Sequence, residues 1–324
     1  MDYISGWCKS QRRLDGATAI VTGSNSGIGK ETAKDLYYRG ARVIMACRDT
    51  ARAEEAKKEI ESAKVQNEPT GCLVVEELDL NSLQSVREFT RRMVANEQDL
   101  KILINNAGVM CAPEGLTEDG FETHMGTNHF GPALLTLMLL PRLQRNTPSR
   151  IINVSSMLHA GGDLDFNDIN YKKSEYNALQ AYSRSKCANV LFTLGLARML
   201  KEHGIDGVNT YSLHPGVINT EISRHFSDSI LYGATWAFKY VLSWFMKSAR
   251  CGAQTTIYCA VDEACAGETG LYYEDCGSRD PSIFCQNDEV VSKFWDITIA
   301  SLNFGDYNPF TNSDPEKKHF LNHM

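Results

Sequence analysis

The sequence predicts an α/β fold in which a doubly wound, mostly parallel sheet of seven strands is covered by helices on both faces. Short β-rich runs alternate with longer segments of helical periodicity, which is typical of parallel sheets. Runs such as residues 102–105 are apolar without alternation, as expected of strands buried on both faces. The first run also leads into a glycine-rich loop and a helix. The expected strands cover residues 18–22, 42–47, 72–78, 102–105, 150–155, 208–214 and 270–273.

The composition indicates a globular protein and excludes several classes of function. The 324 residues include 33 Lys and Arg against 40 Asp and Glu, a formal net charge of −7, with no basic block beyond residues 11–13. Nucleic-acid binding needs a basic face, so nucleic acid is not an expected partner. The ten cysteines form no C-x-x-C pair and no zinc-type spacing with histidine. We therefore expect reduced thiols, no metal and a reducing compartment.

The apolar residues favour a cytoplasmic protein. The first thirty residues contain no apolar run that resembles a signal peptide or a spanning helix. The longest apolar stretch, residues 230–246, is interrupted by Gly233 and Lys239 and is too short and too polar for a confident span.

The loop after the first strand has the pattern of a phosphate-binding turn. Its spacing is G-x-x-x-G-x-G, and a helix of about residues 30–38 follows. Glycines there let the backbone approach a pyrophosphate, which lies against free N–H groups at the positive end of the helix dipole. The alternative is a strand–helix turn that needs glycine for its shape alone. The residues predicted to bind the pyrophosphate of a dinucleotide in this Rossmann-type fold are Gly23, Ser24, Asn25, Ser26, Gly27, Ile28 and Gly29.

The ends of the second and third strands indicate which dinucleotide is bound. A free 2′-hydroxyl is usually met by an Asp or Glu at the end of the second strand. This sequence has Arg48 instead, whose guanidinium can pair with a 2′-phosphate, so we predict NADP(H) rather than NAD(H). Arg48 could alternatively be a solvated residue at the strand end. Asp79 and Leu80 follow the third strand and could contact the adenine, but Asp79 could also be the N-cap of the next helix.

Polar residues farther along the chain form a candidate reaction centre. Residues 105–108 are small and polar where the fourth strand would end beside a cofactor, and the fifth strand ends in two serines at residues 155–156. Tyr182 and Lys186 are four residues apart in a helical segment, so their side chains can converge. An ammonium near a phenol favours the phenolate and should lower the pKa of Tyr182 from about 10. A serine hydroxyl nearby would hold a substrate oxygen.

Together these motifs resemble those of the short-chain dehydrogenase/reductase family. T-G-x-x-x-G-I-G at residues 22–29, N-N-A-G at 105–108, the paired serines, Y-x-x-x-K at 182–186 and His-Pro-Gly at 214–216 occur in the family's order. The resemblance covers about 200 residues, from the first strand to the sixth. It implies an oxidoreductase in which hydride passes between a nicotinamide and an alcohol or carbonyl.

The resemblance also implies a role for each matching residue. Tyr182 would donate or accept the proton, Lys186 would bind the nicotinamide ribose and lower the Tyr182 pKa, and Ser156 would hydrogen-bond the reacting oxygen. Asn128 would kink a helix of about residues 122–143 around a water in a proton relay, and Pro132 is expected to alter that helix locally. Further cofactor contacts would be Asn106, Ala107, Gly108, Pro215, Gly216, Val217 and Thr220.

Some of these assignments have alternatives. Ser155 rather than Ser156 could face the cleft, because adjacent strand residues point to opposite faces. Asn128 could serve only to cap or kink its helix. The histidines near these motifs are expected to be structural rather than catalytic: His129, His159 and His214.

Two further features are similar to NADP-using retinol dehydrogenases of this family. Between Ser156 and Tyr182 lie 25 residues, about a dozen more than in the family's shorter members, and they include the acidic segment 162–169. The strand end at residues 46–49 and Gly-Ala-Gln-Thr at 252–255 are also similar. This resemblance implies retinal, other aldehydes or lipid carbonyls as substrates, with reduction favoured where NADPH exceeds NADP⁺.

The C-terminal third has three interpretations. The aromatic run that includes residues 230–246 lies where the family covers its substrate, which favours a bulky hydrophobic substrate. The same residues could be ordinary core, or an amphipathic helix in peripheral contact with a membrane. The helix of about residues 122–143 and the Tyr182 helix could also pair across a two-fold axis in a homodimer, but core packing explains their apolar residues equally.

The leading hypothesis is one domain, residues 1–324, that interconverts a hydrophobic alcohol and its aldehyde or ketone with NADP(H). The nucleotide-binding half would cover about residues 16–160 and the catalytic and substrate-covering part about 161–310, with tails at 1–15 and 311–324. Length alone allows about two domains, but no linker divides the motifs. The alternatives are a steroid, ecdysteroid or xenobiotic carbonyl reductase on the same scaffold, and a non-catalytic NADP(H)-sensing regulator.

Overall fold

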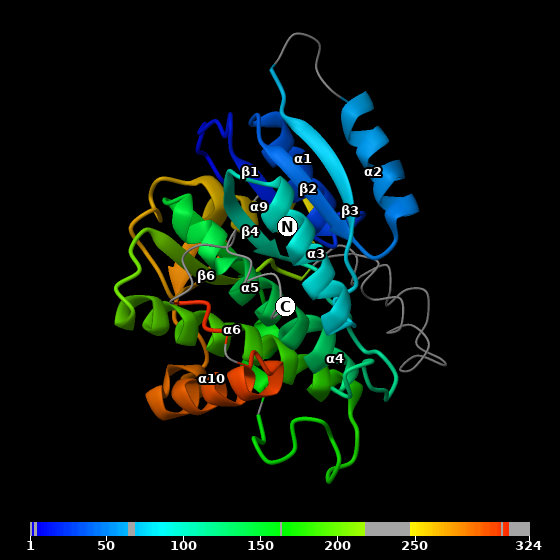
Figure 1. Ribbon diagram of the computed structural model, residues 1–324, viewed down its shortest axis with the longest axis vertical. Coiled ribbons are helices and arrows are strands. Elements are labelled where there is room, and N and C mark those ends of the chain that lie inside the picture. Colours follow the sequence, from blue (N-terminus) through cyan, green and yellow to red (C-terminus); the bar gives the residue numbers. More distant parts are fainter. Residues whose placement is uncertain are drawn as a thin grey trace.

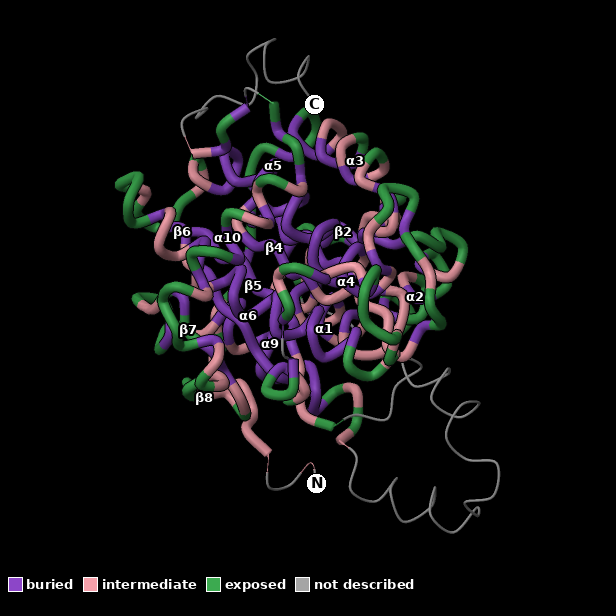
Figure 2. The backbone as a smooth tube through the Cα atoms, turned by 90° about the horizontal axis from the view of Figure 1, so that it is seen from below, coloured by how far each residue is buried: buried purple, intermediate pink, exposed green. Residues whose placement is uncertain are grey.

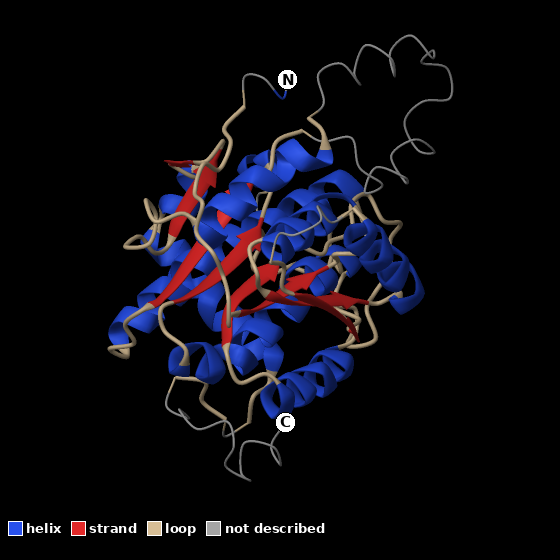
Figure 3. Ribbon diagram, turned by 90° about the horizontal axis from the view of Figure 1, so that it is seen from above, coloured by secondary structure: helices blue, strands red, loops and turns tan. Residues whose placement is uncertain are grey.

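A single β-sheet organises the protein. The computed structural model describes residues 2, 5–63, 69–162, 164–217, 247–305 and 307–310. Within these residues, eight strands lie in the order β3-β2-β1-β4-β5-β6-β7-β8, all parallel except β8, which pairs antiparallel with β7. Figure 3 shows this twisted sheet between helices on both of its sides. The predicted doubly wound fold is confirmed, with one strand more than the expected seven.

The strand bounds match the predicted ones to within two residues. Strands β1, β2 and β6 begin and end as expected, β3, β5 and β7 differ by one residue, and β4 begins two residues earlier. The bounds are β1 Thr18–Thr22, β2 Arg42–Cys47, β3 Cys72–Glu77, β4 Leu100–Asn105, β5 Ser149–Val154, β6 Val208–His214 and β7 Leu271–Glu274.

The additional strand is β8, Gly277–Arg279, which returns from β7 through a turn of Asp275 and Cys276. Both turn residues have positive φ, 48° and 58°, as the tightest hairpin turns require. Asn-Gly or Asp-Gly is usual in such turns, so Asp-Cys gives little signal in the sequence. A strand of three residues is also too short to show alternation, and this explains the wrong count.

Helices cover the sheet in two layers, as Figure 1 shows. The helices α1, α2 and α9 pack on one face, where their buried side chains join those of the strands in one hydrophobic cluster. The helices α3, α5 and α6 pack on the other face, and α10 lies on the outer side of α6. Their bounds are α1 Gly27–Tyr38, α2 Thr50–Ser62, α3 Leu83–Asn96, α5 Gly131–Arg145, α6 Ala178–Glu202, α9 Ala249–Val261 and α10 Asp288–Leu302.

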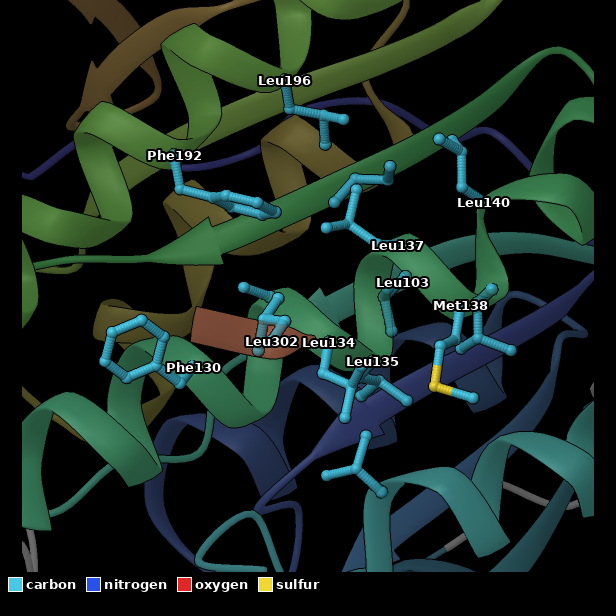
Figure 4. Packing of buried hydrophobic residues seen from close by; sticks show 14 of the residues in the cluster. Leu103, Phe130, Leu134, Leu135, Leu137, Met138, Leu140, Phe192, Leu196 and Leu302 are labelled. Carbon is cyan, nitrogen blue, oxygen red and sulfur yellow. The ribbon is translucent and has the colours of Figure 1, made fainter. Parts of the chain in front are cut away.

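The largest part of the core lies between the sheet and helices α5 and α6. All residues of α5 from Gly131 to Leu143 are buried, and Figure 2 shows the buried chain gathered around β4, β5 and α6. Figure 4 shows Leu134 and Leu137 of α5 packed near Leu103 of β4. Of the helices in the described ranges, none has the length and apolar character needed to cross a membrane.

The helix predicted at about residues 122–143 is confirmed but is not uniform. It begins as α4, Thr123–Met125, continues as a π-helical turn, η2, at Gly126–Phe130, and passes into α5. The Gly131 N–H donates to the Gly126 carbonyl five residues earlier, which widens the turn. Pro132 lacks an N–H for the carbonyl of Asn128, so its position favours this local departure from α-helical bonding.

A buried polar network joins the middle of the sheet to both flanking helices. The Asn105 amide donates to Asn153 Oδ1 and to Thr136 Oγ1, each at 2.8 Å. Asn153 in turn donates to Thr193 Oγ1 at 2.9 Å. These contacts set β4 and β5 against α5 and α6, because displacement of any element would leave a buried amide unpaired.

Asn153→Val tests this network. Loss of the Asn153 amide leaves a donor on Asn105 and an acceptor on Thr193 unpaired in the core. We therefore expect the free energy of unfolding to fall by about 1–3 kcal/mol. Urea denaturation measures the change, with Asn96→Ala, an exposed asparagine at the end of α3, as the control. Equal stability of Asn153→Val and wild type would contradict this role of the network.

Candidate active site

A cavity of about 650 Å³ lies at the carboxyl ends of the strands, where ligands bind in open parallel sheets. It brings together most of the residues predicted from the sequence. Thr220 lies outside the described residues, and Ser24 and Asn128 do not line the cavity. The predicted residues that line it are Gly23, Asn25, Ser26, Gly27, Ile28, Gly29, Arg48, Asp79, Leu80, Asn106, Ala107, Gly108, Ser156, Tyr182, Lys186, Pro215, Gly216 and Val217.

The glycine-rich loop is shaped to accept a phosphate group. Gly23 has φ of 65°, and a Cβ there would lie 2.9 Å from the Cα of Ala107. The N-cap residue of α1, Ser26, makes no side-chain capping bond within the described chain, so the side chain leaves the first N–H groups of the helix to a ligand. The Ser24 hydroxyl instead donates to the Val21 carbonyl at 3.0 Å, so this side chain supports the loop from below.

The loops after β1 and β4 are tied together by a threonine that sequence reasoning missed. Thr22 Oγ1 accepts the backbone N–H groups of Asn106 and Ala107, both at 3.0 Å. The Asn106 side chain returns a bond to the Thr22 carbonyl at 2.8 Å. The N-N-A-G segment is therefore held against the glycine-rich loop, where both can contact the same dinucleotide.

Two arginines line the cavity at the end of β2. Arg48 is exposed at the strand end and lines the cavity, and Arg52 on the first turn of α2 joins it. The N-cap Asp49 fixes this turn by accepting the Arg52 N–H at 3.0 Å. Arg52 was missed because only the strand end was considered. Asp79 is not the N-cap of α3, a role that Ser82 has, so this alternative is wrong.

Tyr182, Lys186 and Ser156 converge on one wall of the cavity. The two α6 residues face the end of β5, where the Lys186 ammonium donates to the Val154 carbonyl at 2.9 Å and lies 5.7 Å from the Tyr182 ring centroid. Burial lowers the pKa of Lys186 to about 8. Burial also raises the pKa of Tyr182 to about 12, while a hydrogen bond with Ser156 lowers it by a smaller amount.

The expectation of a lowered Tyr182 pKa is therefore wrong for this structure. Spacing along a helix shows that an ammonium is near a phenol, but not that both groups are withdrawn from water. Tyr182 is only 6% exposed, and the cost of burying a phenolate exceeds the benefit of its neighbours. At neutral pH Tyr182 is a phenol and Lys186 an ammonium ion.

The side chains of Ser155 and Ser156, either of which could face the cleft according to the sequence, point in different directions. The Ser155 hydroxyl is buried and donates to the Lys186 carbonyl at 2.7 Å, so it points into the β5–α6 packing. Both residues line the cavity, but it is the Ser156 side chain that bonds to Tyr182, as predicted. Its backbone carbonyl lies 2.7 Å from Nδ1 of His159, which holds the strand end in place.

The histidines hold segments of chain together, which is consistent with the expected structural role, although His214 also lines the cavity. His214 Nδ1 accepts the N–H groups of Met157 at 3.1 Å and Gly216 at 3.3 Å, which joins the loops after β5 and β6. Burial lowers the pKa of His214 to about 4 and that of His129 to about 3. Both rings are therefore neutral at physiological pH.

The side chain of Asn128 is committed to structural bonds. Its amide donates to the Val109 carbonyl and to Ser185 Oγ, each at 2.9 Å, and its oxygen accepts the Val109 N–H at 2.7 Å. Thr127, its neighbour, lines the cavity. Asn128 thus holds the loop after β4 and the helix α6 beside the π turn.

Comparison with known proteins agrees with this geometry. The family model described as short chain dehydrogenase matches residues 17–230. Human retinol dehydrogenase 11 is 43% identical over 92% of this chain and 89% of its own length. Human retinol dehydrogenase 14 is 44% identical over 88% of this chain and 86% of its own length.

Solved structures share the fold. An uncharacterized protein from Mycobacterium paratuberculosis has a TM-score of 0.72 at 32% identity, over 92% of this chain and 98% of that one. A protein from Beutenbergia cavernae is described as a putative NAD(P)-dependent gluconate 5-dehydrogenase with bound NADP. It has a TM-score of 0.61 at 22% identity and covers 80% of this chain and 95% of its own.

Lys186→Met removes a buried ammonium, so we expect the variant to have a larger free energy of unfolding than wild type at neutral pH. The folded pKa of about 8 is below the usual 10.5. Between pH 8 and pH 10.5, Lys186 is protonated in the unfolded wild type but mostly neutral in the folded protein. The free energy of unfolding of wild type should therefore rise by about 1.4 kcal/mol per pH unit relative to that of the variant. Urea denaturation below and above pH 8 measures this; a difference that stays constant would contradict the lowered pKa.

Proposed function

Because the chain belongs to the short-chain dehydrogenase/reductase family and is an oxidoreductase, we propose that it uses NADP(H) to interconvert a hydrophobic alcohol and its aldehyde or ketone. The observation that carries this proposal is the convergence of Tyr182, Lys186 and Ser156 on the cavity that contains the glycine-rich loop. A proton donor, a hydrogen-bond donor and a dinucleotide site then lie in one cavity, as hydride exchange with a carbonyl requires.

Several features support NADP(H) as the cofactor. The N-terminus of α1 can receive the pyrophosphate, while Arg48 and Arg52 offer two guanidinium groups to a 2′-phosphate. When bound, the nicotinamide supplies or accepts the hydride. The related fold from Beutenbergia cavernae was solved with bound NADP, which is consistent with the same cofactor here. The other predicted cavity-lining residues would complete the contacts, with Lys186 on the ribose and residues 215–217 near the nicotinamide.

The chain's own contribution to the chemistry is to hold and move a proton. With its pKa raised to about 12, Tyr182 is in the acid form at neutral pH and can donate its phenolic proton to a carbonyl oxygen during reduction. The Ser156 hydroxyl would hydrogen-bond the same oxygen and orient it. In oxidation the ionised form of Tyr182 would accept the proton, and little of this form is present at neutral pH. Reduction is the proposed direction where NADPH exceeds NADP⁺. Asn128 would shape the relay by fixing the π turn.

The cavity rim supports a hydrophobic substrate. Met110 and Leu158 line the cavity, and Met157 and Val217, 52% and 51% exposed, border it. Such exposed apolar side chains around a cavity are typical of sites for apolar ligands. Retinol dehydrogenases are related to this chain over nine-tenths of its length, so retinal and similar aldehydes are the proposed substrates.

The cellular location and the oligomeric state of the protein are predictions from the sequence. We propose that it works in the reducing environment of the cytoplasm, in peripheral contact with the membranes that hold hydrophobic substrates. Residues 230–246, the predicted contact segment, lie outside the described residues. The apolar residues of α5 are buried in the core of their own chain. Core packing therefore explains them without a homodimer contact.

Tyr182→Phe tests the catalytic assignment. Loss of the transferable proton should reduce kcat/KM for NADPH-dependent reduction of retinal by on the order of 10²–10⁴-fold, with NADPH binding retained. Tyr171→Phe is a matched control, because its buried hydroxyl has no hydrogen-bond partner in the described chain. NADPH oxidation that is unchanged in Tyr182→Phe would overturn the assignment. A protein that only senses NADP(H) would show no turnover in wild type.

Arg48→Ala tests cofactor recognition. Removal of one guanidinium from the 2′-phosphate should weaken NADPH binding by about tenfold or more and leave NADH binding unchanged. Fluorescence titration with both cofactors measures the two dissociation constants. Lys57→Ala, on α2 but outside the cavity lining, controls for a general loss of positive charge. Equal wild-type affinity for NADH and NADPH would contradict the proposed preference.

A further inference from the structure

The segment from Val109 to Ala112, which follows β4, is held by side chains at both of its ends. Asn128 bonds both backbone groups of Val109. At the other end the Ala112 N–H donates to His124 Nε2 at 3.1 Å, and the Ala112 carbonyl accepts from the Tyr176 hydroxyl at 2.8 Å. Four backbone groups without a strand partner are thereby bonded to side chains.

Two residues, Met110 and Cys111, lie between these anchors. Met110 lines the cavity, and Cys111 is near enough to Tyr182 to affect its ionisation. Cys111 also has φ of 52°, a left-handed conformation that is unfavourable for a residue with a Cβ. Such a backbone persists only where its surroundings hold it, so the anchors at Val109 and Ala112 are needed.

His124 is the centre of the second anchor. It is completely buried, and its Nδ1 lies 2.7 Å from Glu122 Oε1. Because Nε2 accepts the Ala112 N–H, the ring proton must be on Nδ1, where it donates to the carboxylate. Glu122 also accepts the N–H groups of His124 and Met125, each at 2.9 Å, and so begins the helix that carries Asn128.

The same anchor contacts the catalytic tyrosine. The His124 and Tyr182 rings are edge to face, with centroids 6.3 Å apart. Tyr176 lies 3.4 Å from His124 Nδ1 and directly precedes Asn177, the N-cap of the helix that carries Tyr182. One cluster thus touches the loop after β4, the start of the Asn128 helix and the start of the Tyr182 helix.

We propose that Glu122, His124 and Tyr176 are positioning residues that hold the Val109–Ala112 segment against Tyr182, so that Met110 selects among hydrophobic substrates by size. This proposal rests on the proposed carbonyl reduction only where it is tested with aldehyde substrates. A loosened segment would let Met110 move into or away from the substrate space, while the phosphate contacts at Gly23 and Arg48 lie on other strand ends and stay intact.

Tyr176→Phe tests the proposal with the smallest change, since it removes only the hydroxyl that holds Ala112. We expect KM for retinal to rise about tenfold, a smaller effect on a short aliphatic aldehyde, and an unchanged NADPH dissociation constant. Tyr171→Phe, whose ring lies 5.4 Å from that of Tyr176, removes a buried hydroxyl without a partner in the described chain and should behave as wild type. An unaltered preference between the two aldehydes in Tyr176→Phe would overturn the proposal.

His124 is tested by a pair of variants. His124→Gln keeps an oxygen that can accept the Ala112 N–H, whereas His124→Leu does not, so glutamine should restore most of the wild-type KM and leucine should not. Equal defects in both would show that the acceptor is not what matters and would overturn the proposal. If the leucine variant does not fold, the comparison of Tyr176→Phe with Tyr171→Phe still decides.

A readout without substrate separates this proposal from the proposed function. Hydrogen exchange of the Val109–Ala112 amides, followed by mass spectrometry, should be faster in Tyr176→Phe and His124→Leu than in wild type and Tyr171→Phe. Unchanged exchange would overturn the anchoring role whatever the enzyme reduces. If wild type reduces no carbonyl, the proposed function fails, and the exchange rates still support or overturn the anchor.

Discussion

The geometry of the cavity depends on one buried junction, in which strand β5 and helix α6 each hold the other's backbone. The Lys186 ammonium donates to the Val154 carbonyl, and the Ser155 hydroxyl donates to the Lys186 carbonyl. An ammonium removed from water is costly unless its donors are bonded. The strand end therefore cannot slide along the helix without leaving a charge unpaired, and this constraint keeps Ser156 beside Tyr182.

Histidine rings accept backbone N–H groups of three loops that follow the strands. Loops at the ends of parallel strands have N–H groups that no neighbouring strand accepts, and buried ones need another acceptor. A neutral imidazole accepts on one nitrogen and donates on the other, so it can join two segments of chain. Burial lowers the pKa values of His159 and His214 and keeps both rings in this state. The rings of His124, His159 and His214 accept the N–H groups of Ala112, Ser282 and Met157, respectively.

The parts of the structure that follow from local pattern were predictable from the sequence, and those that depend on burial were not. Apolar runs and the glycine spacing gave the strands and the dinucleotide loop, because strand burial and tight turns leave local signals. The Asp275–Cys276 hairpin lacked the usual turn residues. The networks of Thr22 and Asn105 join residues distant in sequence, so no spacing reveals them. The Tyr182 pKa was predicted in the wrong direction because desolvation depends on the whole fold.

The burial of the Lys186 ammonium beside Tyr182 has a cost in stability at neutral pH that the proposed reaction can explain. A buried ammonium with a lowered pKa and a phenol with a raised pKa are both less stable when charged than they would be in water. The same burial keeps Tyr182 protonated, which is the form that can give a proton to a carbonyl oxygen. It also strengthens every hydrogen bond to the developing charge, since little water competes. A more exposed tyrosine would ionise at lower pH and would be protonated less fully. Burial thus keeps Tyr182 in the acid form that the proposed reduction of a hydrophobic carbonyl uses.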